Sequence, residues 1–162
     1  MRVILAEKPS VAQSIAAVLG ADQKKNGYLQ GENDLVSWCI GHLIELAPPE
    51  IYDARYAKWR REDLPIVPSA WGSVVSDGTK KQFAVLKDLL NRTDVDEVVC
   101  ATDAGREGEL IFRMVYEKTG CTKPVKRLWI SSLEESAIRE GFRSLKPDTA
   151  YDALYRAALC RA

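Results

Sequence analysis

The chain has 162 residues, of which 46% are apolar and 28% charged, which suits one domain with its own core. Its 23 basic and 23 acidic residues cancel, which disfavours a protein that coats nucleic acid through a general positive field. No apolar run approaches the roughly 18 residues of a membrane span, and the run at residues 3–6 is too short for a secretory signal.

The first predicted elements are a buried strand and a helix. Residues 3–6 form a short apolar run, and Pro9 suits the first turn of a helix. Apolar residues then follow at helical spacing as far as Leu19, and Gly20 suits a helix end. The first twenty residues therefore predict a β–α unit.

The stretch from residue 24 to residue 68 breaks this rhythm. Residues 27–30 and 34–40 predict a β-hairpin, with Val36 and Trp38 on one face. Pro48 and Pro49 end any regular element, and a short helix is predicted over residues 54–61. We interpret the stretch as an insertion between βα units or an excursion along a sheet edge.

Regular alternation returns after Gly78. Apolar spacing predicts helices around residues 83–90 and 110–118, and strands at residues 97–101 and 125–130. Ser132 is expected to cap the next helix, with Glu135 as its capping-box partner. Such alternation predicts a parallel sheet covered by helices on both faces. Residues 149–162 predict a helix without a stop signal, so we expect the chain to be the front piece of a longer protein.

The four cysteines are far apart and form no C-x-x-C pair. This predicts reduced thiols in a cytoplasmic protein and argues against a zinc site. All four tryptophans stand in apolar surroundings and are predicted to pack in the core; they are Trp38, Trp59, Trp71 and Trp129.

Two predicted strands carry an acid at their carboxyl ends. Glu7 follows RVILA and Asp103 follows EVVCAT, and a basic residue comes soon after each acid, Lys8 in one case and Arg106 in the other. Parallel strands would bring both acids to one edge of the sheet, where ligands of α/β proteins gather.

Helical spacing separates the two glutamates of GREGEL. Glu107 shares a stripe with Leu110 and is predicted to point inward near the sheet edge. Glu109 lies off that stripe, where it can pair with Arg113 as a surface salt bridge.

A metal ion is one explanation for these acids. Two carboxylates ~4 Å apart repel by about 4 kcal/mol at an effective dielectric near 20. If Glu7, Asp103 and Glu107 converge, they need a divalent cation or a raised pKa, and oxygen-only ligands suit Mg²⁺. Spacing alone leaves open whether they form a metal site or are scattered surface acids.

Five segments then carry a family resemblance. AEKPSVAQSIAAVLG, GHLIEL, LPIVP, ATDAGREGELIFR and RLWISSLEESAIREGF occur in this order over nearly the whole chain. EKPS together with TDAGREGE is highly specific, whereas GHLIEL alone is weak. Together they resemble the N-terminal Toprim domain of type IA DNA topoisomerases, in the bacterial topoisomerase III branch.

The resemblance implies an α/β Toprim fold. Its Rossmann-like, mostly parallel sheet would have helices on both faces and a hairpin or loop insertion at about residues 24–68. Residues 1–147 would form the Toprim domain, and residues 148–162 would begin the next helical segment of the longer protein.

The resemblance also implies roles for matching residues. Glu7 would act as general acid/base at the ribose 3′ oxygen, and Lys8 would contact the scissile phosphate and stabilise transition-state charge. Mg²⁺ would be held by Asp103 and Glu107 with Glu7. Arg106 would contact a phosphate or orient an acid.

One position departs from the family pattern, which often has Asp where this chain has Gly105. Weaker Mg²⁺ binding is therefore expected. The family's nucleophilic tyrosine lies in a later domain, so the isolated chain is expected to be inactive. The implied partners are single-stranded DNA segments, the remaining domains of the polypeptide and a helicase, with no membrane. No P-loop motif is present, in keeping with relaxation that needs no nucleotide.

Several alternatives remain open at this level. His42 is either structural or a DNA contact. In residues 55–61, basic side chains alternate with aromatic ones, so this segment either binds single-stranded nucleic acid or is a packed, solvated segment. Toprim domains of primases and nucleases, or a non-catalytic DNA-binding or interaction module, are rival functions. A dinucleotide-binding domain is disfavoured because GREG is not G-x-G-x-x-G.

Overall fold

The centre of the protein is a mixed sheet of 7 strands in the order β2-β3-β4-β1-β7-β8-β9. The structure is a computed structural model and describes residues 1–161. The strands are β1 (Arg2–Ala6), β2 (Gln23–Lys25), β3 (Tyr28–Gln30), β4 (Asp34–Trp38), β7 (Glu97–Ala101), β8 (Val125–Arg127) and β9 (Lys146–Pro147).

Only the middle of this sheet is parallel. Strands β4, β1, β7 and β8 run parallel to one another, whereas β2 and β3 on one side and β9 on the other are antiparallel to their neighbours. The mostly parallel sheet expected from the sequence is thus confirmed, and the antiparallel pair β3–β4 confirms the hairpin expected at residues 27–40; the antiparallel edge strands β2 and β9 were not expected. The short hairpin connections explain the edge on the β2 side, because a parallel neighbour needs a long crossover.

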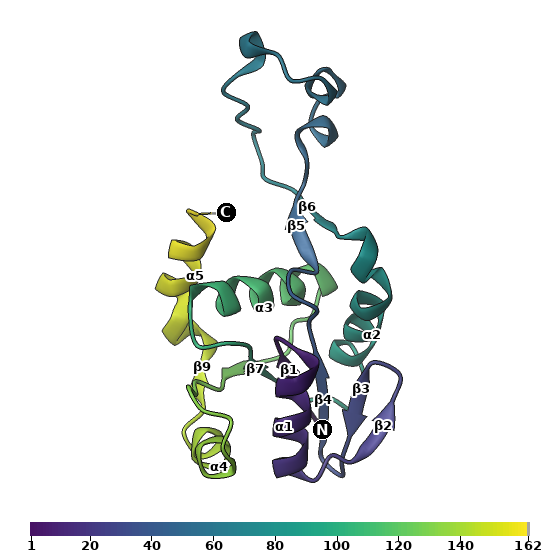
Figure 1. Ribbon diagram of the computed structural model, residues 1–162, viewed down its shortest axis with the longest axis vertical. Helices are drawn as coiled ribbons and strands as arrows, with labels where there is room; N and C mark the ends of the chain where they lie inside the picture. Colours follow the sequence, from purple (N-terminus) through teal and green to yellow (C-terminus); the bar gives the residue numbers. More distant parts are fainter. Residues whose placement is uncertain (162) are drawn as a thin grey trace.

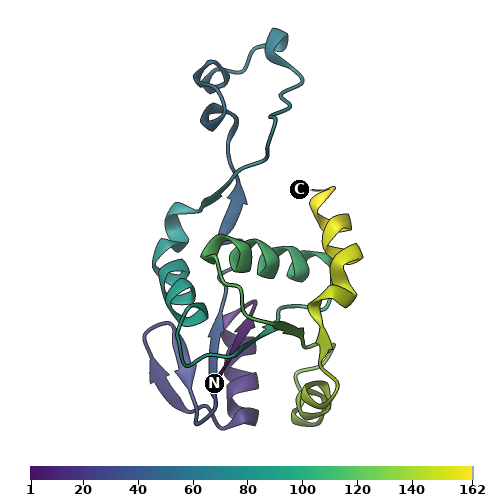
Figure 2. The ribbon, with the colours of Figure 1, turned by 180° about the vertical axis from the view of Figure 1, so that it is seen from behind.

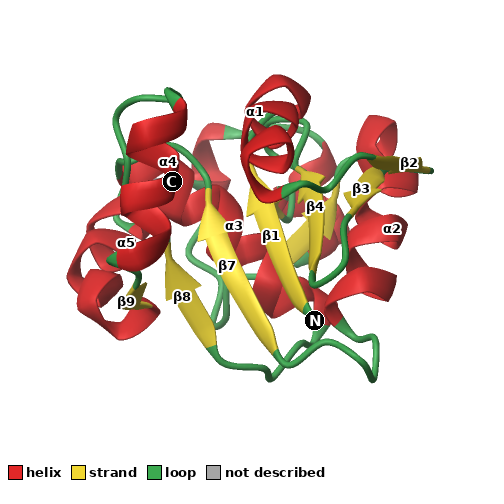
Figure 3. Ribbon diagram, turned by 90° about the horizontal axis from the view of Figure 1, so that it is seen from below, coloured by secondary structure: helices red, strands yellow, loops and turns green. Residues whose placement is uncertain are grey.

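Helices cover both faces of the sheet, as predicted. Helices α1 (Pro9–Leu19) and α4 (Glu135–Arg143) lie on one face. The other face carries α2 (Lys80–Leu90), α3 (Arg106–Thr119) and α5 (Asp152–Leu159) (Figure 3). No helix in the described part of the chain is long and apolar enough to cross a membrane.

Alternating strand residues build the two cores. In β1, Val3 and Leu5 pack under α2 and α3, while Ile4 and Ala6 pack under α1. This alternation follows from the two-residue period of a strand, and fully apolar strands are typical of sheets buried on both faces. Gly20 ends α1 in the left-handed conformation, at φ 71°, as its position predicted.

A long arm leaves the sheet between β5 (Ile44–Leu46) and β6 (Ser73–Val75), which pair as a separate antiparallel ribbon. We call residues 47–72 the arm. It projects beyond the helices and contains three 3₁₀ turns, η1 (Pro49–Ile51), η2 (Ala54–Ala57) and η3 (Arg61–Asp63) (Figures 1 and 2). Of the stretch predicted as an insertion at about residues 24–68, β3 and β4 extend the main sheet beside β1, and the arm takes up the later part.

The arm also corrects the prediction for the tryptophans. Trp59 and Trp71 on the arm are 76% and 65% exposed, and Trp129 is 43% exposed. Only Trp38 packs against a core cluster. Apolar neighbours in the sequence do not bury a side chain when the segment itself leaves the sheet.

The C-terminal third differs in detail from its prediction. Strand β8 is shorter than predicted, because Trp129 turns aside and stacks on Tyr151. Helix α4 begins at Glu135, not at Ser132, whose hydroxyl accepts a hydrogen bond from the Glu134 backbone instead. Strand β9 was missed, since two residues that include a proline give little strand signal. Helix α5 forms where the last helix was predicted.

Candidate functional site

Two acids from different parts of the sequence meet at one edge of the sheet. Parallel pairing of β1 and β7 places Ala6 beside Ala101, so Glu7 and Asp103 follow at neighbouring strand ends. The backbone N–H of Asp103 donates to Glu7 Oε2 at 3.2 Å. Glu7 is 8% exposed, whereas the Asp103 side chain is 57% exposed. The structure therefore brings the two predicted acids together.

A cavity of about 720 Å³ opens beside these acids. Its volume lies in the range of ligand sites, and the N-terminus of α3 faces it with partial positive charge that suits an anion. Its lining carries acids and bases together: Glu7, His42, Asp103, Arg106, Glu107 and Arg161, with Ala104, Gly105, Gly108, Leu110 and Ala158.

The predicted phosphate contacts lie at the same edge. Lys8 Nζ is 3.8 Å from Asp103 Oδ2, and its side chain is 58% exposed, so the ammonium remains free to meet an anion. Arg106 is the first residue of α3 and is exposed where it lines the cavity. Both cations thus stand exposed at the edge of the sheet that carries the acids.

Glu107 and His42 form a contact that the sequence did not predict. His42 Nε2 lies within hydrogen-bond distance of Glu107 Oε1, between the loop before β5 and the first turn of α3. The Glu107 side chain is 70% exposed, so the inward orientation predicted for it is wrong. Its position in the first turn of α3 lets the side chain extend into the cavity rather than onto the sheet.

The donor chemistry of the cavity fits Mg²⁺ only in part. Glu7, Asp103 and Glu107 supply carboxylate oxygens to one cavity, and Mg²⁺ prefers a few carboxylates plus water. Within residues 1–161, however, no three histidine, cysteine or acidic side chains are grouped closely enough to hold a metal ion together. These acids could serve as ligands if water and substrate oxygens complete the coordination.

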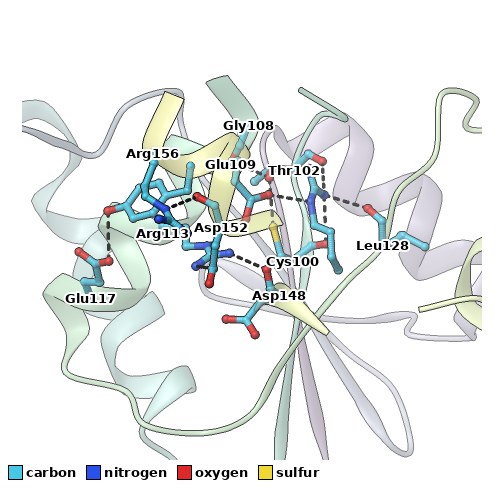
Figure 4. Close-up of polar contacts among 12 residues, drawn as sticks. Cys100, Thr102, Gly108, Glu109, Arg113, Glu117, Leu128, Asp148, Asp152 and Arg156 are labelled. Atoms are coloured by element: carbon cyan, nitrogen blue, oxygen red, sulfur yellow. Dashed lines mark hydrogen bonds and ion pairs between the residues drawn. The ribbon is translucent and has the colours of Figure 1, made fainter. Parts of the chain in front are cut away.

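Behind the cavity lies a buried ion pair. Glu109 and Arg127 are 1% and 0% exposed, and Arg127 Nε donates to Glu109 Oε2 at 3.1 Å. Glu109 also accepts from Arg113 at 3.0 Å, which confirms the predicted pair but not its surface location. Figure 4 shows Glu109, Arg113 and Asp152 in one connected set of polar contacts.

Neighbouring titratable groups are held in their neutral forms. Burial raises the pKa of the Cys100 thiol to about 11, and burial also raises the pKa of Tyr151. Burial likewise raises the pKa of Tyr155, on α5, to about 12. None of these three groups is poised to ionise near neutral pH.

Sequence reasoning missed Arg127 as a contributor to this site. Its signal was available, because Arg127 shares the inward face of β8 with Val125, and a buried arginine needs a partner. The partner could not be found by local spacing, since Glu109 is on α3 and was expected at the surface. His42 was noticed, but its contact with Glu107 spans 65 residues of sequence.

The chain is similar to known proteins over nearly its whole length. A family model described as the Toprim domain matches residues 2–133. DNA topoisomerase 3 of Bacillus thuringiensis (strain Al Hakam) is 52% identical over 160 residues, which are 99% of this chain and 22% of that protein. DNA topoisomerase 3 of Shouchella clausii (strain KSM-K16) is 53% identical over 161 residues, again 99% of this chain and 22% of the relative.

A solved structure agrees on the fold. Full-length topoisomerase I from Thermotoga maritima superposes with a TM-score of 0.65 at 23% identity, covering 98% of this chain and 23% of that one. At this identity the likeness concerns the fold. The chain spans about a fifth of the length of the relatives that it matches.

Proposed function

Since the chain belongs to the Toprim domain family, we propose that it is the N-terminal part of an ATP-independent type IA DNA topoisomerase of the topoisomerase III kind. In this proposal it supplies the acid/base group and the Mg²⁺ ligands for cleaving and rejoining single DNA strands. The nucleophilic tyrosine, which forms the 5′-phosphotyrosine link, belongs to the remainder of the polypeptide.

One observation carries the proposal: Glu7 and Asp103 are joined at the ends of adjacent parallel strands, beside a cavity that also holds basic side chains. A strand-cleaving site needs an acid near the leaving oxygen and cations near the phosphate. Both kinds of group are present at this edge of the sheet, the acids joined by a hydrogen bond and Lys8 at 3.8 Å from Asp103.

The proposed roles follow from this placement. As the P–O3′ bond breaks, Glu7 would donate a proton to the ribose 3′ oxygen, and it would take that proton back when the strand is rejoined. Lys8 and Arg106, both exposed at the same edge, would bind the phosphate oxygens on which charge develops. Bound Mg²⁺ would neutralise phosphate charge, and Asp103, Glu107 and Glu7 would hold it.

A chimeric enzyme tests the proposal. The 162-residue chain replaces the matching 160 residues of the Bacillus thuringiensis relative, and relaxation of negatively supercoiled plasmid is measured with Mg²⁺ and without nucleotide. We expect relaxation by the chimera and none by the isolated chain. Glu7→Gln should reduce the rate by roughly 10²–10⁴-fold, the usual contribution of a general acid or base.

Glu32→Gln is the matched control, because Glu32 is exposed in the turn between β3 and β4 and should leave the rate unchanged. A well-folded chimera that relaxes equally well with Glu7→Gln would refute the acid/base role. Nicked or degraded plasmid in place of rejoined circles would favour the nuclease alternative, and an inert chimera would favour the non-catalytic module.

Two further proposals concern the location of the protein and the division of the chain. We propose a cytoplasmic location because the cysteines Cys39, Cys100, Cys121 and Cys160 are all free. The division into a Toprim domain at residues 1–147 and a following helical segment at residues 148–162 also remains a proposal, as do DNA and helicase partners.

A further inference from the structure

We propose that the buried pair of Arg127 and Glu109 positions the backbone of Asp103 and thereby sets the affinity of the site for a divalent cation. We call residues 102–105 the Asp103 turn. The inference rests on the proposed function, because it takes Asp103 as a metal ligand. In this scheme Arg127 touches neither metal nor DNA and is a positioning residue.

Arg127 makes several hydrogen bonds to backbone carbonyl groups. Its guanidinium is fully buried and donates to carbonyl oxygens around the end of β7: Nη1 lies 2.7 Å from Thr102 O and 3.2 Å from Cys100 O, and Nη2 lies 2.7 Å from Asp103 O. Nη1 also reaches Leu128 O at 2.8 Å. One side chain from β8 thus grips three residues of the β7 end.

Only an arginine side chain can make all of these hydrogen bonds at once. Its planar fork presents five N–H donors in fixed directions, whereas a lysine ammonium is a compact point charge. Lysine at position 127 could still pair with Glu109, yet it could not reach Thr102 O and Asp103 O at the same time. The geometry therefore uses the shape of the guanidinium and not only its charge.

The charge of Arg127 is balanced by Glu109. Glu109 accepts from both Arg127 and Arg113, and Arg113 in turn donates to Asp152 at 2.8 Å and to the Asp148 carbonyl at 2.7 Å. A buried charge without its partner is strongly destabilising, so this chain of pairs fixes Arg127 in place. It also ties the Asp103 turn to α5 through Arg127 and α3; Figure 4 shows the part of this set around Glu109, Arg113 and Asp152.

The opposite side of the Asp103 turn is also held by hydrogen bonds. The N–H of Asp103 donates to Glu7, and the Thr102 hydroxyl donates to Gly108 O at 2.7 Å. A Cβ at position 108 would lie 2.2 Å from Asp103 O, so glycine there lets α3 approach the turn closely. The Asp103 peptide is held at both ends, while its carboxylate stays 57% exposed to the cavity.

This arrangement is how proteins orient metal ligands. A ligand whose backbone is fixed loses little freedom on binding, and replacing such supporting groups typically weakens metal binding by about 10–100-fold. The Arg127 pair supplies this support for Asp103 from a position that neither the metal nor the substrate reaches.

The test measures metal binding directly on the 162-residue chain. Mn²⁺, as a spectroscopic stand-in for Mg²⁺, is titrated and followed by electron paramagnetic resonance, with Mg²⁺ competition. Arg127→Lys should weaken binding by about tenfold or more, as expected for a lost supporting contact. Gly108→Ala should weaken it too, because the added methyl displaces Asp103 O without altering any charge.

Arg2→Lys is the matched control. Arg2 makes a two-bond ion pair with Asp34, at 2.8 Å and 3.1 Å, near the amino ends of β1 and β4, far from the cavity. This change should lower the unfolding midpoint while leaving Mn²⁺ affinity unchanged. A loss of affinity in Arg127→Lys that exceeds the loss in Arg2→Lys at similar stability would therefore support positioning over general destabilisation.

The possible outcomes separate the two ideas. Tight Mn²⁺ binding by the wild type together with unchanged binding by Arg127→Lys and Gly108→Ala overturns the positioning role and leaves the proposed function standing. If Arg127→Lys does not fold, Gly108→Ala alone decides. A wild-type chain that binds no Mn²⁺ overturns Asp103 as a ligand in the isolated chain, and the inference falls with it, while the chimera assay still reports on catalysis.

Discussion

At the scale of single residues, Gly105 has the clearest consequences for the site. Its backbone is extended, with φ at 178° and ψ at 177°, and nothing lies within 4 Å of the place where a Cβ would be. Any residue can adopt this conformation, so no steric reason demands glycine. The position faces the cavity together with Asp103 and Glu107.

We therefore expect Gly105→Asp to bind Mg²⁺ more tightly than the wild type by at least several-fold. The change adds a carboxylate between two others without displacing a neighbour, and a higher ligand charge raises affinity for hard cations. Titration calorimetry with Mg²⁺ measures the effect. Gly78→Asp is the control, since that glycine also has open space but lies before α2. Equal affinity in wild type and Gly105→Asp would mean that the acidic motif is misplaced.

The site residues differ in how far they could be predicted. Glu7 and Asp103 could be found because each stands within two residues of the end of an apolar strand, and the ends of parallel strands share an edge. Glu109 was misplaced because helical spacing measures only the distance of a residue from the apolar stripe. Helical spacing contains no information about Arg127, which comes from a strand later in the chain and stabilises the buried Glu109 carboxylate by pairing with it.

At the scale of elements, α4 shows how packing can reverse a helix preference. Gly141 lies in the last turn of this helix, against the residues that follow β8. A Cβ there would lie 2.5 Å from Ile130 Cγ2 and 2.7 Å from Leu128 Cδ1. The close approach of α4 to the sheet thus depends on a missing side chain.

Gly141→Ala should consequently lower the free energy of unfolding by roughly 1–3 kcal/mol, the usual cost of overpacking a core. In an exposed helix the same change would stabilise by about 0.5–1 kcal/mol, so the sign is diagnostic. Urea unfolding followed by circular dichroism measures the difference. Ser136→Ala, exposed on the same helix, should change stability little. Greater stability in Gly141→Ala would show that α4 does not pack so closely.

Element types were more predictable than their edges. Strand β7 and helices α1 and α3 end where apolar runs and glycines indicated, because those signals are local. The start of α4 was predicted too early, since Ser132 can satisfy a turn as well as a helix end. Strand β9 pairs with β8 across almost twenty residues of sequence and has no pattern of its own.

At the scale of the whole molecule, the arm stands apart from the sheet and the helices on its two faces. Its base is closed by a hydrogen bond from Ala47 N to Gly72 O at 2.9 Å. Large apolar side chains on it are exposed, among them Trp59 and Val67 at 76% and 73%. The arm therefore contributes little burial to the domain that carries it.

We expect that replacing residues 49–70 with a short glycine–serine turn will move the unfolding midpoint by only a few degrees. A shorter loop has a smaller entropic cost of closure, by about 0.6 kcal/mol for each halving of its length. The replacement also removes no core side chain. Thermal unfolding followed by circular dichroism provides the measurement. A loss of cooperative unfolding would contradict the independence of the sheet from the arm.

The hydrogen bonds that fix the Asp103 peptide have a consequence for repeated cycles of cleavage and rejoining. Under the proposed function, a DNA strand cut at this site must be rejoined at the same site. A turn held by Glu7, which follows β1, on one side and by β8 on the other keeps its place between the two events. The carboxylates would then act as a fixed landmark to which the parted DNA end returns, so accuracy of rejoining would come from the stiffness of this domain.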